Sequence, residues 1–216
     1  MSVTFSVYPL KEEIPTFREV IELTTKKLGE FLRSYEIEFN SEIDVKLVSK
    51  KDGSQQKVDL DSLAVWDNEV NYSLFSVIPF QSGVDVYYWE LDEEEKADYM
   101  EEVLDSVERP KENPYGEENN RKILVKECFD NKREWHVKKW AGQHYIASVA
   151  FGFIASSFAQ LTDGIIYSAD GGWDYQIFPA TAKEFDKVYF RPENAISEDR
   201  REEVSSYLEE LRLELI

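Results

Sequence analysis

Hydrophobic and polar residues alternate with a period of two in several short stretches of the chain. This pattern places the apolar side chains on one face of an extended segment and predicts β-strands. The stretches that show it are residues 3–8, 43–47, 70–78, 84–90, 123–127 and 134–140. The turn residues 51–54 follow the second stretch and precede Val58 and Leu60, so this part of the chain is predicted to form a hairpin.

Other stretches repeat their apolar residues every three or four positions, as amphipathic helices do. Pro15 suits the first turn of the earliest one, and Thr181 with Glu184 has the spacing of a capping box at a later one. The predicted amphipathic helices cover residues 17–32, 92–107 and 181–190 and a terminal segment that begins after Ser197. The chain therefore mixes helices and strands throughout.

Residues 142–161 differ from the other helical stretches because they are apolar on almost all sides. Alanine, glycine and serine fill the positions between the large apolar residues. A helix of this kind belongs in the middle of a domain, where small residues let neighbouring elements approach. Asp163-Gly164 predicts its end, with the glycine in the left-handed conformation. Residues 165–167 then predict a short strand before the turn at residues 169–172.

The order of these elements predicts one α+β domain spanning residues 1–216. A mixed or mostly antiparallel sheet is expected to pack against the central apolar helix and the amphipathic helices. No internal repeat or long linker divides the chain. Residues 109–120 contain prolines and a glycine among acidic residues, so a mobile acidic loop is predicted there.

The chain of 216 residues carries a formal net charge of −19, which narrows the choice of partners. A surface this acidic repels phosphate groups, so we expect no binding to nucleic acid or to an anionic membrane. The charge favours either simple solubility or a basic protein partner, which the acidic field would attract. A hydrophobic content of 42% is sufficient for a folded core.

The amino terminus lacks the basic segment and the long apolar segment of a signal peptide. The densest apolar run, residues 145–158, is shorter than the roughly 18 residues that span a bilayer. A single cysteine, Cys128, excludes an internal disulfide and a multi-cysteine zinc site. These features predict a cytoplasmic protein, and they are compatible with a homo-oligomer.

Enzymatic chemistry finds little support in the sequence. Phosphate-binding loops, nucleophile elbows and dinucleotide-binding glycine motifs do not occur, and His136 and His144 do not have the spacing of metal ligands. We therefore predict no catalytic, cofactor-binding or metal-binding residues and no enzyme activity. The alternative is a small hydrolase or metal-dependent enzyme in which His144 acts with Asp163, Asp170 and Asp174.

Residues 141–193 combine an alanine-rich helix with Leu-Thr-Asp-Gly-Ile-Ile at 161–166 and Asp-Gly-Gly-Trp at 170–173. Pro179 and a helix that contains Phe185 follow. This segment resembles a group of bacterial immunity proteins that are encoded with polymorphic toxins or contact-dependent-inhibition toxins. The resemblance implies a cytosolic antidote that binds and neutralises one cognate toxin and has no catalysis of its own.

The acidic stretch at residues 92–107 supplies the candidate surface for such a partner. Carboxylates beside an aromatic side chain suit a basic protein, because complementary charge speeds association and an aromatic ring can anchor the interface. The candidate partner-binding residues are Asp92, Glu93, Glu94, Tyr99, Glu101 and Glu102. A housekeeping protein-interaction module with an unrelated partner is the remaining alternative.

Overall fold

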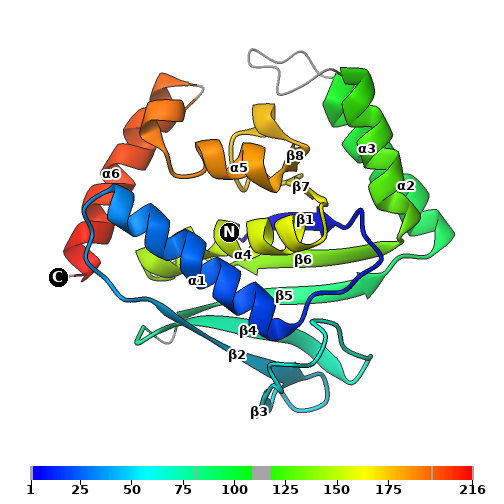
Figure 1. The fold of residues 1–216 in the computed structure, drawn as a ribbon, viewed down its shortest axis with the longest axis horizontal. Coiled ribbons are helices and arrows are strands. Elements are labelled where there is room, and N and C mark those ends of the chain that lie inside the picture. The colour runs from blue at the N-terminus through cyan, green and yellow to red at the C-terminus, as the bar shows by residue number, and fades with distance from the viewer. Residues whose placement is uncertain (1, 81, 109–117, 196, 216) are drawn as a thin grey trace.

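The computed structural model of the chain describes residues 2–80, 82–108, 118–195 and 197–215. Within these ranges, strands from both halves of the chain form one antiparallel sheet (Figure 1). The strands are β1 (Val3–Tyr8), β2 (Glu42–Ser49), β3 (Gln55–Lys57), β4 (Val70–Ile78), β5 (Ser82–Glu90), β6 (Arg133–Lys139), β7 (Ile165–Tyr167) and β8 (Ala180–Thr181). Their order across the sheet is β3-β2-β4-β5-β6-β1-β7-β8, so the N-terminal strand lies inside the sheet.

Helices connect and cover these strands. The α-helices are α1 (Phe17–Ser34), α2 (Glu93–Glu108), α3 (Glu118–Asp130), α4 (Tyr145–Leu161), α5 (Ala182–Val188) and α6 (Glu198–Leu215), with short 3-10 helices η1 (Tyr175–Ile177) and η2 (Pro192–Asn194). The predicted α+β class and the predicted antiparallel sheet are confirmed. Capping boxes at Thr16 and Thr181 begin α1 and α5. No helix in the described ranges is long and apolar enough to cross a bilayer.

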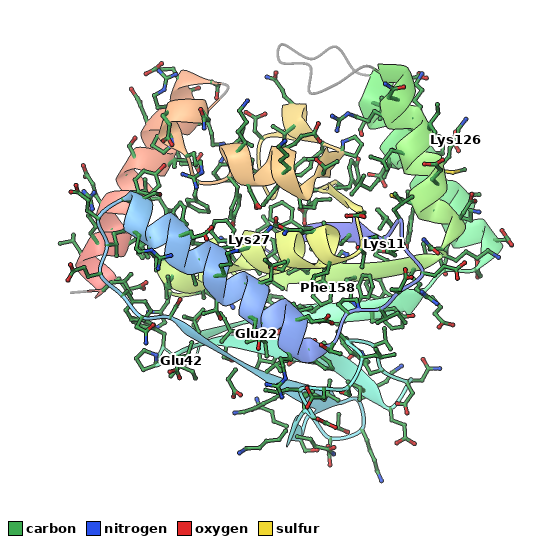
Figure 2. The ribbon with its side chains drawn as sticks, viewed as in Figure 1. Lys11, Glu22, Lys27, Glu42, Lys126 and Phe158 are labelled. Carbon is green, nitrogen blue, oxygen red and sulfur yellow. The ribbon has the colours of Figure 1, made fainter. Side chains whose placement is uncertain are left out.

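One side of the sheet, here called the helical face, is covered by α1 and α4. Phe158 of α4 lies against the sheet, with its ring centroid 5.0 Å from that of Trp135 and 6.3 Å from that of Phe75 (Figure 2). Phe151 stacks on Phe5 with 4.4 Å between ring centroids. Because α1, the sheet and α5 surround α4, this helix is buried on nearly all sides, as its composition predicts.

The predicted strand at residues 123–127 is wrong, because these residues belong to α3. Where burial in this helix is described, the buried side chains are Val125, Cys128 and Phe129. Their spacing of three and four positions is helical, whereas only two alternating apolar residues supported a strand. Most of the loop predicted at residues 109–120 lies outside the described residues, and residues 118–120 form the first turn of α3.

The end of α4 also differs from the prediction. Asp163, and not Gly164, adopts the left-handed conformation, with a φ of 49°. Gly164 is required for another reason, since a Cβ atom there would lie 2.4 Å from the carbonyl oxygen of Tyr8. The glycine thus lets the chain leave α4 and enter β7 directly beside β1.

The other side of the sheet, here called the open face, carries polar side chains of the central strands. Ser6 and His136 lie on this face, while the buried Trp135 lies on the helical face. At one end of the sheet, α2 and α3 pack against each other (Figure 1), and the ring of Phe129 in α3 lies 4.2 Å from that of Tyr8. A cleft remains between α2 and the open face.

Candidate functional site

Carboxylates and aromatic rings gather in a cavity of about 220 Å³ between α2 and the open face. We call this cavity the open-face cleft. Its lining comes from β1, β5, β6, β7, the turn after β7 and α2, most of which are far apart in the sequence. The lining residues are Thr4, Ser6, Tyr8, Trp89, Tyr99, Glu102, Glu134, His136, Tyr167 and Ala169.

The register of the strands brings these residues together. Ser6 of β1 lies opposite both His136 of β6 and Tyr167 of β7, so three side chains form one row across the open face. Glu134 precedes His136 by two positions and therefore lies on the same face, opposite Trp89 of β5. Alternation along each strand sets the shared face, and pairing between distant strands sets the row.

Glu134 is unusual among the charged residues of the cleft because only 2% of it is exposed. Its Oε1 atom lies 3.2 Å from Nδ1 of His136. Among the described residues, no lysine or arginine forms a salt bridge with it. A carboxylate that loses its water without gaining a strong cationic partner raises the free energy of the folded state. A cationic group from outside the chain would therefore stabilise it.

Ser6, His136 and Glu134 resemble a catalytic triad in composition but not in geometry. The Oγ atom of Ser6 lies 3.3 Å from Nδ1 of His136, which is the same nitrogen that contacts Glu134. A triad needs the serine at one imidazole nitrogen and the carboxylate at the other. Because a single nitrogen meets both groups here, the arrangement does not activate Ser6 in that way.

Aromatic rings line the rim of the cleft. Trp89 is 42% exposed and stacks on Tyr87 with 5.7 Å between ring centroids. The Trp89 ring also lies 5.1 Å from the imidazole of His136. Tyr99 of α2 adds a further partly exposed ring. The faces of such rings attract cations, and the attraction grows where water is excluded.

Nearby ionisable groups indicate a negative and poorly solvated environment. Burial, and next the charge of Glu134, raises the pKa of Tyr8 well above 10.0. The same two causes, in the same order, raise the pKa of Tyr99. On β5, burial raises the pKa of Asp85 above its ordinary value of 3.8. The open face therefore disfavours further negative charge and favours a bound cation.

Two of the six predicted partner-binding residues line the open-face cleft. They are Tyr99 and Glu102, and the carboxylate of Glu102 accepts a hydrogen bond from the Tyr167 hydroxyl at 3.2 Å. Glu94 and Glu101 are exposed on the same helix. Their carboxylates extend the acidic surface from the cleft toward solvent.

The other two predicted residues have structural contacts. The carboxylate of Asp92 accepts hydrogen bonds from the backbone N–H groups of Glu94 and Glu95, each at 2.9 Å, and so caps the start of α2. Glu93 forms a salt bridge with Lys132, which follows α3. Asp92 and Glu93 therefore hold α2 in place.

The structure separates the residues of the predicted enzyme alternative. His144 precedes α4 and Asp163 follows it, and the 17 residues of this helix place its ends roughly 25 Å apart. Nδ1 of His144 lies 2.8 Å from the carboxylate of Glu214, while Asp163 pairs with Lys11 at 2.7 Å. The acid–base pair of His144 and Asp163, which belongs to the enzyme alternative, is thus not formed.

The remaining members of that alternative have hydrogen-bond partners of their own. Asp170 accepts hydrogen bonds from the backbone N–H and the hydroxyl of Thr4, and Asp174 accepts one from the backbone N–H of Gln176. The described residues contain no group of three or more side chains placed to hold a metal ion. Cys128 is buried, and burial raises its pKa to about 12, so the thiol is neutral near pH 7.

Comparison of the chain with known protein families, characterised proteins and solved structures gives no match. The resemblance of residues 141–193 to immunity proteins therefore stays a prediction. In the fold this segment contains α4, β7 and α5 and supplies much of the core. The open-face cleft is lined mainly by residues that precede this segment.

Ser6, Tyr8, Trp89 and Glu134 are not recognisable as site residues from the sequence alone. Their one local signal is the alternation of the strands, which places them on the face opposite to the apolar residues. Alternation is equally typical of strands with an ordinary solvated face. The missing information is the pairing of β1 with β6, since Ser6 and His136 are 130 positions apart.

Proposed function

We propose that the protein is a non-catalytic, immunity-type protein that binds and neutralises a basic toxin on its open face. The observation that carries this proposal is the burial of Glu134 without a lysine or arginine partner among the described residues. A lysine or arginine side chain of the toxin would enter the open-face cleft and pair with this carboxylate. Such a pair lies away from water, where charge-assisted hydrogen bonds are strong.

The rim of the cleft is suited to the same partner. Trp89 and Tyr99 offer partly exposed ring faces, which can anchor an interface and stabilise a cation. The exposed Glu102 supplies a second carboxylate to the lining of the cleft. A cationic side chain would thus meet negative charge at the floor and aromatic surface at the rim.

The exposed surface of α2 suits the approach of a basic protein. Glu94 and Glu101 point to solvent, and the whole chain has a net charge of −19. Complementary charge raises association rates and orients the partner before contact. An immunity protein benefits from rapid association, because its toxin must be neutralised before it acts.

The test begins with capture of partners on the tagged protein, followed by expression of each captured protein in the absence of this chain. The proposal predicts a basic partner at equal stoichiometry that stops growth when expressed alone and becomes harmless when this chain is co-expressed. A captured partner that is harmless alone would favour the housekeeping module instead. Capture of acidic proteins only would contradict the proposed charge complementarity.

A matched pair of variants tests the surface itself. Glu94→Lys with Glu101→Lys reverses charge on α2, whereas Glu22→Lys with Glu42→Lys makes the same charge change on α1 and β2 (Figure 2). We expect the α2 variant to lose protection against the toxin and the control to keep it. Equal loss in both variants would indicate that only net charge matters, and unchanged protection in the α2 variant would remove this helix from the interface.

A further inference from the structure

A second cavity, of about 150 Å³, lies on the helical face of the sheet beneath α6. Lys139, at the end of β6, and Val3, its register partner in β1, contribute to the lining. Aromatic surface comes from Phe151 of α4, from Trp173 in the segment after β7, and from Tyr207 of α6. A cavity of about 150 Å³ can hold a molecule the size of benzene. Its dimensions therefore suit a small organic ligand.

The ammonium group of Lys139 is the polar feature of this cavity that lacks a partner. Strand alternation directs the side chain to the helical face, as it does for Val137 and Trp135. Within the described residues, its Nζ atom forms no hydrogen bond or salt bridge. Burial lowers the pKa of Lys139, and the more distant carboxylate of Glu203 only partly opposes this effect.

The carboxylate of Glu203 is already engaged by another cation. It lies 2.8 Å from the guanidinium of Arg200, which is also positioned over the Trp173 ring at 5.1 Å from its centroid. The two cations, Lys139 and Arg200, thus face one carboxylate in the cavity. In a chain of net charge −19, this cavity is locally positive when Lys139 is protonated.

The hydroxyl groups of both tyrosines in the lining, Tyr189 and Tyr207, already form hydrogen bonds within the protein. Tyr189 donates to the carbonyl oxygen of Ser148 at 2.9 Å and accepts from the N–H of Gly152 at 3.1 Å. This residue therefore offers a ligand its ring and not its hydroxyl. Recognition of a polar group in the cavity falls to Lys139, with Arg200 beside it.

We propose that this cavity binds a small organic monocarboxylate with an apolar body about the size of one ring. The carboxylate pairs with the ammonium of Lys139, and the body packs against Phe151 and Trp173. Binding is reversible and involves no covalent step. The site lies on the opposite side of the sheet from the open-face cleft, so it does not depend on the proposed toxin partner.

Binding of an anion at Lys139 has a defined dependence on pH. The titratable or charged groups that face this amine are Arg200, Glu203 and Tyr207 of α6 and Tyr189 after α5. Burial raises the pKa of both tyrosines, to about 12 for Tyr207, so neither gains charge as the amine titrates. Affinity for a carboxylate therefore falls as pH rises through the lowered pKa of Lys139.

Calorimetric titration with benzoate, and with benzamide as its neutral analogue, tests the site. The wild-type chain is expected to bind benzoate at least tenfold more tightly than benzamide. Lys139→Met is expected to abolish this preference, and Lys138→Met, which removes the neighbouring lysine on the open face, is expected to preserve it. A melting curve for each variant establishes that it is folded.

Three results would overturn the assignment: no saturable binding of benzoate by wild type at millimolar concentration, equal affinity for benzoate and benzamide, or an unchanged preference in the Lys139→Met variant. Should that variant fail to fold, the wild-type chain provides the decisive readout by itself. Its affinity for benzoate must fall with rising pH while its affinity for benzamide stays constant. Parallel pH dependence of the two ligands would contradict a carboxylate–ammonium pair.

Discussion

The two faces of the sheet bury charges of opposite sign. The buried carboxylates of the open face are Asp85 and Glu134. The helical face instead holds the buried ammonium group of Lys27 from α1 and the partly buried one of Lys139 from β6. Among the described residues, the fully buried charges are thus two carboxylates on the open face and one ammonium group on the helical face, and they differ in how well the protein pairs them.

Lys27 and Glu134 illustrate this difference. The Nζ atom of Lys27, which lies between α1 and α4 (Figure 2), contacts the carboxylate of Asp186 and the hydroxyl of Ser156, each at 2.6 Å. Ser156 also donates to Asp186 at 2.6 Å, which closes the network. Among the described residues, the carboxylate of Glu134 has a polar side-chain contact only with the imidazole of His136. Both residues are buried, but Lys27 is paired with an oppositely charged side chain, whereas Glu134 would be stabilised by a cationic partner from outside the chain.

The largest expected effect is a difference in stability between a truncated side chain on the helical face and one on the open face. Phe158→Ala removes a ring that packs on Trp135 and Phe75, so it is expected to lower the free energy of unfolding by about 4 kcal/mol. Trp89→Ala on the open face is expected to cost about 1 kcal/mol or less, because its side chain is already half exposed. Urea denaturation measures both values. Equal costs would mean that the open face is part of the core.

A smaller loss of stability is expected when the ion pair between Lys27 and Asp186 is broken. Asp186→Asn removes the anion that holds Lys27 and is expected to cost about 2 kcal/mol. This is less than for a fully buried pair, because the Asp186 side chain is 28% exposed. Asp61→Asn breaks the exposed pair with Arg18 and serves as a control that is expected to have no measurable effect in urea denaturation. A harmless Asp186→Asn would show that Lys27 needs no partner.

Removing the charge of Glu134, which has no lysine or arginine partner among the described residues, is expected to leave stability nearly unchanged or to raise it. Glu134→Gln keeps the shape of the side chain and removes its charge, so the free energy of unfolding is expected to change by less than about 1 kcal/mol or to rise. Affinity for the basic partner is expected to fall at least tenfold, about 1.4 kcal/mol. Denaturation and partner titration give the two numbers. A large loss of stability without loss of binding would make Glu134 a structural residue.

The smallest expected effect concerns pH. Burial raises the pKa of Asp85 in the folded state above its ordinary value of 3.8, which applies to the unfolded state. Between the unfolded-state pKa and the folded-state pKa, the folded state therefore binds more protons than the unfolded state. Wild type therefore loses stability as pH rises through this window. Asp85→Asn cannot ionise, so it is expected to be more stable than wild type at pH 7 and equal to it below 3.8. An advantage that persists at low pH would have a cause other than ionisation.

Much of the fold follows from local patterns in the sequence. The alternation of β6 places Trp135 and His136 on opposite faces, and the apolar composition of residues 145–161 makes α4 the centre of the core. These predictions succeed because period and composition act within one element. The strand predicted at residues 123–127 fails because its apolar run is too short to distinguish a period of two from a helical period.

The candidate site is much less accessible from the sequence. The acidic helix around Tyr99 and Glu102 can be recognised from its composition. Its position over β1 and β6 depends on tertiary packing, which the local sequence does not indicate. The burial of Glu134 depends on the register between strands that are distant in the chain. His144 and Asp163 show the reverse case, because the enzyme alternative groups two residues that the rigid α4 keeps apart.

The most direct test of the central claim is a titration of the isolated protein with ethylguanidinium, followed by NMR signals of Trp89, Tyr99 and His136. Ethylurea has nearly the same shape without the charge and serves as the matched probe. We expect saturable changes at these three residues with ethylguanidinium only, and we expect these changes to be lost in the Glu134→Gln variant. Equal responses to both probes, or an unchanged response in the variant, would contradict a cation-binding role for the open-face cleft.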